Sequence, residues 1–126
     1  MITRVLLCDD VAEYRLLVRL ALEEDPQIHV IGEAADGLEA CRLVERLVPD
    51  VVLLDLAMPE LDGLECIPRM RAAAPDACII VLSGFQAERM AGPVMATGAD
   101  GYLEKGVTLS VVRERILAGR TAPAVT

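Results

Sequence analysis

The stretch Val51-Val52-Leu53-Leu54-Asp55 decides the fold of this 126-residue chain, because it is apolar at four positions in a row and then ends in a carboxylate. A strand with one face in water alternates apolar and polar residues, whereas a strand covered by helices on both faces is apolar throughout. Similar aliphatic runs stand at residues 4–8 and 78–82. The pattern predicts central strands of a parallel sheet.

Two shorter runs, at residues 28–31 and 101–103, bring the predicted strands to five. Helical spacing of apolar residues fills the gaps: one helix carries Leu16, Leu17, Leu20 and Ala21 and stops at Pro26, and the next ends before Pro49. Strand–helix alternation of this kind predicts a doubly wound α/β sheet with right-handed crossovers. We expect one domain over residues 1–118 and a linker or frayed tail over residues 119–126.

Two predicted helices contain prolines. Pro68 removes one amide donor from the third helix, which we expect to begin late or to bend. Gly92-Pro93 interrupts the fourth helical segment, and interior proline costs about 3 kcal/mol relative to alanine. We therefore expect a short helix from Pro93 to Thr97, with residues 86–91 as a loop or frayed turn.

The composition excludes several classes of function. A formal charge of -8 provides no basic surface for direct contact with nucleic acid. The four cysteines form no CxxC pair and sit in apolar runs, which favours small buried side chains over metal or redox sites. His29, the single histidine, excludes multi-histidine metal sites. Because the sequence shows neither a signal peptide nor an apolar run near 18 residues, we expect a cytoplasmic protein without membrane contact.

Polar side chains follow the predicted strands where each one ends. Asp9 and Asp10 follow the first strand, Asp55 the third, Ser83 the fourth and Lys105 the fifth. In doubly wound sheets, ligands bind at the carboxyl ends of the strands. We therefore expect these five side chains to converge at one edge of the sheet.

The residue types predict the chemistry of this edge. Crowded carboxylates repel unless a cation neutralises them, and Mg²⁺ is a hard ion that takes oxygen ligands and keeps several waters. Asp55, on the most apolar strand, is the candidate nucleophile toward phosphorus, with Lys105 as the fixed cation and Ser83 as a hydroxyl donor to a phosphoryl oxygen. Asp10 is expected to bind the metal directly, and Asp9 directly or through a water.

These residues resemble the receiver domains of two-component response regulators. The similar segments are Leu6–Asp10, Asp55–Gly63, Val81–Gly84 and Gly98–Lys105, which together span nearly the whole chain in the same order and spacing. The resemblance implies a flavodoxin-like five-stranded sheet in the order 2-1-3-4-5 with five helices.

The resemblance also implies a function. A receiver takes a phosphoryl group from the phosphohistidine of a sensor histidine kinase or phosphotransfer protein and later loses it by self-catalysis, so it is not otherwise an enzyme. The family pattern adds the main-chain carbonyl of Ala57 as a metal ligand, and Tyr102 as the aromatic whose ring turns inward when the hydroxyl of Ser83 moves toward the phosphate.

Four positions depart from the family pattern. Gly84 replaces a usual alanine and should leave the pocket open, and Gly106 replaces a usual proline, so we expect a trans peptide after Lys105. Ala57 and Phe85 occupy positions where members with fast hydrolysis carry polar side chains. We therefore expect slow intrinsic dephosphorylation.

Two other functions remain open at this point. The chain can be a phosphorylation-independent binding module of the same fold, or a Mg²⁺-dependent phosphohydrolase with an aspartyl nucleophile. The sequence also leaves open an output domain after Thr126 and a homodimer that forms on phosphorylation.

Overall fold

The computed structural model describes residues 1–60 and 63–119, in which strands and helices alternate. The strands are β1 (Thr3–Cys8), β2 (Ile28–Ala34), β3 (Val51–Leu54), β4 (Cys78–Ser83) and β5 (Gly101–Glu104). The helices are α1 (Ala12–Glu23), α2 (Gly37–Leu47), α3 (Gly63–Ala73), α4 (Ala87–Ala96) and α5 (Leu109–Ala118). All five predicted strands are confirmed.

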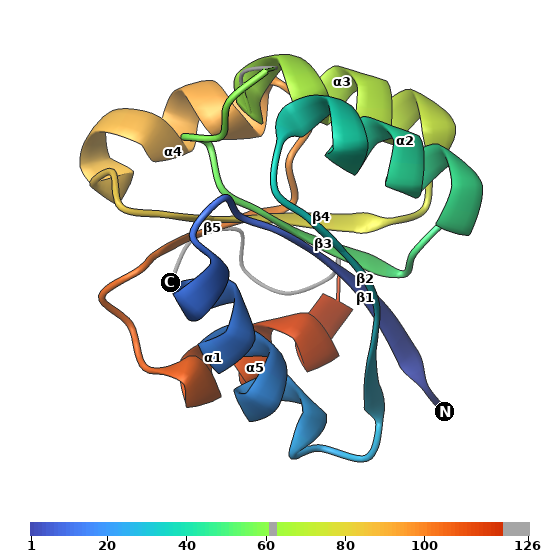
Figure 1. Ribbon diagram of the computed structural model, residues 1–126. Helices are drawn as coiled ribbons and strands as arrows, with labels where there is room; N and C mark the ends of the chain where they lie inside the picture. The colour runs from blue at the N-terminus through green and yellow to red at the C-terminus, as the bar shows by residue number, and fades with distance from the viewer. Residues whose placement is uncertain (61–62, 120–126) are drawn as a thin grey trace.

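The sheet is parallel throughout and its strand order is β2-β1-β3-β4-β5, as expected. Helices α1 and α5 cover one face, and α2, α3 and α4 cover the other (Figure 1). Because the chain switches sides between β1 and β3, the carboxyl ends of these two neighbouring strands open onto a shared edge.

Strand β3 lies at the centre of two apolar cores, one on each face of the sheet. Val52 and Leu54 pack in the core beneath α2, α3 and α4, while Val51 and Leu53 pack in the core beneath α1 and α5. Successive side chains of a strand point to opposite faces, so a strand with two cores needs apolar residues at every position. The four cysteines are buried and free, as the sequence indicated.

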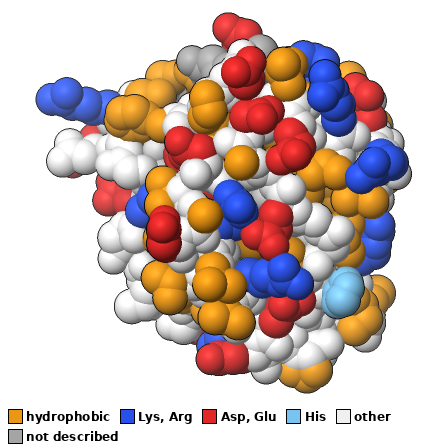
Figure 2. Space-filling view, viewed as in Figure 1, with side chains coloured by type: hydrophobic (Ala, Val, Ile, Leu, Met, Phe, Trp, Pro, Cys, Tyr) orange, Lys and Arg blue, Asp and Glu red, His pale blue; other side chains and the backbone are white. Residues whose placement is uncertain are grey.

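Helix α1 buries a different face from the one that its leucines suggested. Val18 and Leu22 pack against the sheet, whereas Leu16, Leu17 and Leu20 are each more than half exposed. Figure 2 shows hydrophobic side chains gathered on the surface where α1 lies. The prediction of a helix is confirmed, but its strongest apolar stripe faces outward.

Helix α4 corrects a prediction. It runs from Ala87 to Ala96 as one helix with Pro93 inside it, rather than beginning at Gly92-Pro93. The amide of Ala87 donates to the carboxylate of Glu104 over 2.7 Å, and the amides of Arg89 and Met90 donate to the carbonyl of Gln86. These contacts fix the first turn of α4, which begins six residues before the proline. The φ angle of proline suits a helix, so Pro93 removes one backbone hydrogen bond without ending the helix.

Helix α3 also continues through its proline. It begins at Gly63, five residues before Pro68, so the expected late start was wrong, while the alternative of a bend at Pro68 stays a prediction. The peptide between Lys105 and Gly106 is trans, as expected, since the described residues contain no cis peptide bond.

His29 is exposed on β2 and is the pale blue side chain in Figure 2. None of the helices in residues 1–60 and 63–119 is long and apolar enough to cross a membrane. Most of the predicted tail, residues 120–126, lies outside the described residues.

Candidate functional site

Three carboxylates meet at the carboxyl edge of β1 and β3. Cys8 and Leu54 are paired across the two strands, so the residues that follow them emerge side by side, and the amide of Asp55 donates to the carbonyl of Cys8 over 2.9 Å. Carboxylate oxygens of Asp9, Asp10 and Asp55 lie within 4.8 Å of one another. Asp9 and Asp55 are 7% and 5% exposed, while Asp10 is open to solvent.

Lys105, which follows the outermost strand β5, brings a positive charge to the same carboxyl edge. Its backbone amide donates to the carbonyl of Ser83 over 2.8 Å, which ties the end of β5 to the end of β4. Its Nζ lies 2.8 Å from Oδ2 of Asp9 and 3.2 Å from Oδ2 of Asp55. Lys105 is also the only lysine in the sequence.

The surroundings of Lys105 keep it protonated. Burial disfavours the ammonium ion, but the hydrogen bond to Asp9 and the negative charges of Asp55 and Asp9 outweigh burial, so the pKa of Lys105 is raised above its ordinary value. One ammonium cannot neutralise three clustered carboxylates. The remaining negative charge and the all-oxygen donor set suit a hard divalent cation such as Mg²⁺.

Ser83 and Tyr102 lie beside this cluster and are joined through the main chain of Phe85. Ser83, fully buried at the end of β4, accepts a hydrogen bond from the amide of Phe85 over 3.2 Å. The hydroxyl of Tyr102 donates to the carbonyl of Phe85 over 2.6 Å. The Tyr102 ring is 1% exposed, so it occupies the inward position, and burial raises the pKa of its hydroxyl.

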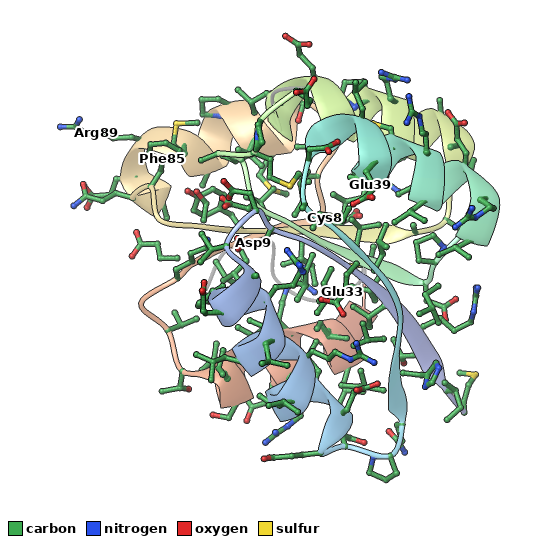
Figure 3. The ribbon with its side chains drawn as sticks, viewed as in Figure 1. Cys8, Asp9, Glu33, Glu39, Phe85 and Arg89 are labelled. Carbon is green, nitrogen blue, oxygen red and sulfur yellow. The ribbon has the colours of Figure 1, made fainter. Side chains whose placement is uncertain are left out.

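Three of the four departures, at Ala57, Gly84 and Phe85, lie at this edge. A Cβ added to Gly84 would meet nothing within 4 Å. Ala57 is exposed and Phe85 is 50% exposed, and Figure 3 shows Phe85 before the start of α4. The amide of Ala57 donates to Oδ1 of Asp55 over 3.2 Å, which places this residue directly beside the carboxylate.

The sequence reasoning missed Tyr14. Its ring centroid lies 4.6 Å from Nζ of Lys105, a cation–π contact that joins α1 to the end of β5. The chain has three aromatic residues, Tyr14, Phe85 and Tyr102, and all three are at this edge of the sheet. In a protein with an aliphatic core, that scarcity was a signal that could have identified Tyr14.

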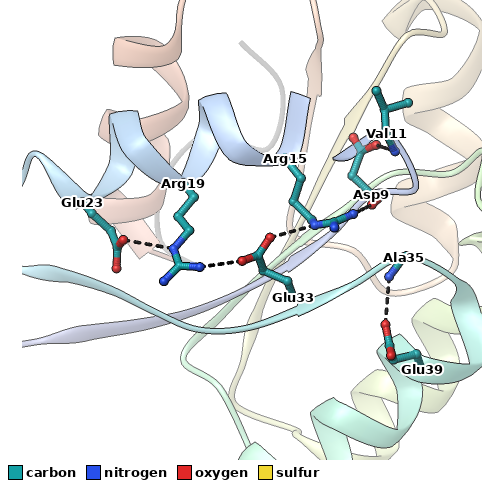
Figure 4. A network of polar contacts seen from close by, with 8 residues as sticks. All are labelled: Asp9, Val11, Arg15, Arg19, Glu23, Glu33, Ala35 and Glu39. Atoms are coloured by element: carbon teal, nitrogen blue, oxygen red, sulfur yellow. Dashed lines mark hydrogen bonds and ion pairs between the residues drawn. The ribbon is translucent and has the colours of Figure 1, made fainter. Parts of the chain in front are cut away.

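The sequence reasoning also missed Arg15, which holds the turn after β1. Its guanidinium donates to the carbonyl of Asp9 and, over 2.7 Å, to Glu33 on β2, and Arg19 donates to the second oxygen of Glu33 (Figure 4). Burial alone would raise the pKa of Glu33, but the hydrogen bonds from Arg15 and Arg19 lower it, so Glu33 stays charged. In addition, Oδ1 of Asp9 accepts from the amide of Val11 over 2.8 Å.

The comparisons with known proteins agree with this geometry. The family model described as the response regulator receiver domain matches residues 5–117. The chain is 41% identical over 115 residues to the transcriptional regulatory protein LiaR of Bacillus subtilis, covering 91% of this chain and 54% of LiaR. It is 37% identical over 113 residues to a protein-glutamate methylesterase of Methanospirillum hungatei, covering 88% of this chain and 33% of that protein.

Solved structures give the same result. The signal receiver domain of the response regulator NarL from Mycobacterium tuberculosis superposes with a TM-score of 0.90 at 29% identity, covering 97% of this chain and 98% of that one. The chain spans about half or less of the length of the curated relatives described above. The parallel sheet with its acidic edge, the family match and these relatives together show that the chain belongs to the receiver domains of two-component response regulators.

Proposed function

We propose that Asp55 is the phosphoacceptor of this receiver and that it takes its phosphoryl group from the phosphohistidine of a sensor histidine kinase or phosphotransfer protein. The observation that carries the proposal is the position of Asp55. Its carboxylate is nearly buried, lies against Lys105, and is within 4.8 Å of two further carboxylates. Asp55 is preferred over Asp9 and Asp10 because it follows the central strand β3, between the two carboxylates that follow β1 and the hydroxyl that ends β4.

The reaction needs few parts. A carboxylate oxygen of Asp55 attacks phosphorus, a P–O bond forms, and the P–N bond to the imidazole breaks as the imidazole leaves with its proton. Lys105 stabilises the negative charge that builds on the phosphoryl oxygens, since its Nζ is already at the carboxylate. The hydroxyl of Ser83 is the donor that we assign to a second phosphoryl oxygen.

The carboxylates of Asp9, Asp10 and Asp55 and the main-chain carbonyl of Ala57 are the groups that we assign to Mg²⁺. Bound there, Mg²⁺ would neutralise the carboxylates and the incoming phosphoryl oxygens. Arg15 and the amide of Val11 hold Asp9, so this ligand is positioned before the ion binds.

The consequence of phosphorylation follows from the contacts of Phe85. When the hydroxyl of Ser83 turns toward the phosphoryl group, it gives up the amide of Phe85, and the carbonyl of the same residue is the acceptor for Tyr102. Phosphorylation therefore changes the segment between β4 and α4, and α4 and β5 are the elements that we assign to signal output. In the whole protein we expect an output domain to read that change.

The test is phosphorylation by a small donor. Acetyl phosphate or phosphoramidate with Mg²⁺ should modify the wild-type protein once, as seen by intact mass, and Asp55→Asn should abolish the modification. Asp76→Asn, at an exposed position beyond α3 and away from the acidic edge, is the control and should behave as wild type. Modification that survives in Asp55→Asn would overturn the assignment, whereas an unmodified wild-type protein would favour a phosphorylation-independent binding module.

A second candidate, a phosphohydrolase, would require a side chain next to the acyl phosphate that orients water. Ala57, the neighbour of Asp55 that the structure places there, has none. Lack of turnover of a general phosphomonoester by the purified protein would agree with the receiver function.

A further inference from the structure

Tyr14 occupies an unusual position for a tyrosine in this protein. It lies in the first turn of α1, next to the acidic edge, and its ring faces the ammonium of Lys105 at 4.6 Å. Its hydroxyl oxygen is buried and has no hydrogen-bond partner among residues 1–60 and 63–119. A buried hydroxyl without a hydrogen-bond partner costs free energy, and an apolar side chain at this position would not have that cost. The aromatic ring of Tyr14 should therefore make a contact that offsets it.

The cavity beside Tyr14 links it to the acceptor. Asp9, Tyr14, Asp55 and Leu82 line a space of about 20 Å³, room for about one water. Tyr14 and the phosphoacceptor therefore border the same small space. On the side of α1 it is lined by Tyr14, Arg15 and Val18.

The position of the Lys105 ammonium depends on more than its two carboxylate partners. A lysine ammonium is a point charge on a flexible four-carbon stem with three N–H donors, and here two carboxylates take it at 2.8 and 3.2 Å. Its side chain is still 23% exposed. Once Asp55 carries an acyl phosphate, the ammonium has to exchange its contact with the Asp55 carboxylate for one with the phosphoryl oxygens, while the aromatic face of Tyr14 stays the same.

We propose that Tyr14 is a positioning residue whose ring holds the ammonium of Lys105 at the phosphoacceptor, before and during phosphoryl transfer. The ring face carries partial negative charge, so it attracts the ammonium without competing for a proton or for the metal. The inference rests on the proposed role of Asp55 and Lys105, and it adds the residue that places the cation. Burial raises the pKa of the Tyr14 hydroxyl, so the phenol is neutral when it does this.

The first experiment uses the fact that Lys105 is the only lysine. In protein labelled with ¹³C-lysine, one side-chain ε-methylene signal reports Lys105 and is shifted by the ring current of Tyr14. Tyr14→Leu should move this signal toward the position for free lysine, and Tyr14→Phe should leave it in place. An identical lysine signal in wild type and Tyr14→Leu would overturn the proposal, whether or not Asp55 is phosphorylated.

The second experiment measures the rate of phosphorylation by phosphoramidate with saturating Mg²⁺. Tyr14→Leu should be slower than wild type by about three- to tenfold, and Tyr14→Phe within about twofold. Affinity for Mg²⁺, measured by isothermal titration calorimetry, should change by less than about twofold in both variants, because the ligands are untouched. Leu17→Ala, on the exposed side of the same helix, is the control and should match wild type.

A double-mutant cycle separates positioning from packing. If Tyr14 acts through the ammonium, Tyr14→Leu should be less stable than Tyr14→Phe only while Lys105 is present, and the difference should vanish in Lys105→Met protein. An equal difference in both backgrounds would reduce Tyr14 to a packing residue. Asp55→Asn run beside these variants shows whether phosphorylation itself is at Asp55, so failure of that assignment is seen separately.

Discussion

Replacing Lys105 by methionine tests the electrostatics of the site before any phosphoryl group is present. The substitution keeps most of the side-chain volume but removes the charge that lies 2.8 Å from Asp9 and 3.2 Å from Asp55. Exposed ion pairs contribute at most about 1 kcal/mol, whereas breaking a buried pair costs about 3–5 kcal/mol. With carboxylates almost fully covered and a lysine 23% exposed, we expect a loss of about 2 kcal/mol without Mg²⁺.

The assay is chemical and thermal unfolding in EDTA and in Mg²⁺. For a domain of this size, about 2 kcal/mol corresponds to a melting temperature lower by roughly 6–10 °C. Because the variant has one positive charge less at the cluster, Mg²⁺ should bind it more tightly and should stabilise it more than wild type. Equal stability of the two proteins in EDTA, with an equal response to Mg²⁺, would refute the electrostatic argument.

The same pair of proteins makes a pH prediction. The pKa of Lys105 is raised on folding, so its contribution to stability is fully present below about pH 10.5 and is lost as the pH rises through the folded-state pKa. Wild type should therefore approach the stability of Lys105→Met in strongly alkaline solution. A constant gap across that range would contradict the assigned ion pairs.

Three further substitutions test other parts of the structure. Ala57→Asn should accelerate loss of the phosphoryl group about tenfold, because it adds a side chain that can orient water beside Asp55; an unchanged decay rate would rule out the expected slow dephosphorylation. Arg15→Met should weaken Mg²⁺ binding about tenfold by loosening the turn at Asp9, whereas Arg19→Met, the matched control, also loses its contact with Glu33 but leaves Asp9 in place. Pro93→Ala should stabilise the protein by about 1–3 kcal/mol in urea unfolding, since it restores a hydrogen bond inside α4; a loss of stability would mean that the proline is required there.

The sequence by itself determined the fold class and most of the site. Doubly covered strands must be apolar throughout, so the runs ending at Cys8, Leu54 and Leu82 identified the sheet, and the polar residues after them identified its active edge. Asp9, Asp10, Asp55 and Lys105 are brought together as predicted. This works because side-chain alternation along a strand is a local rule, and because the carboxyl ends of parallel strands lie at one edge of the sheet; the strand order itself came from the family resemblance.

Only the tertiary structure decided which helix faces pack and what surrounds the lysine. Apolar periodicity indicated that α1 is a helix, but two stripes on it were apolar, and the direction in which α1 crosses the sheet buried Val18 and Leu22 instead of Leu16 and Leu17. Helix α4 starts at Ala87, before Gly92-Pro93, where Glu104 at the end of β5 accepts a hydrogen bond from its first amide. The contact between Tyr14 and Lys105 joins residues far apart in the chain, so no local pattern could place the ring over the ammonium.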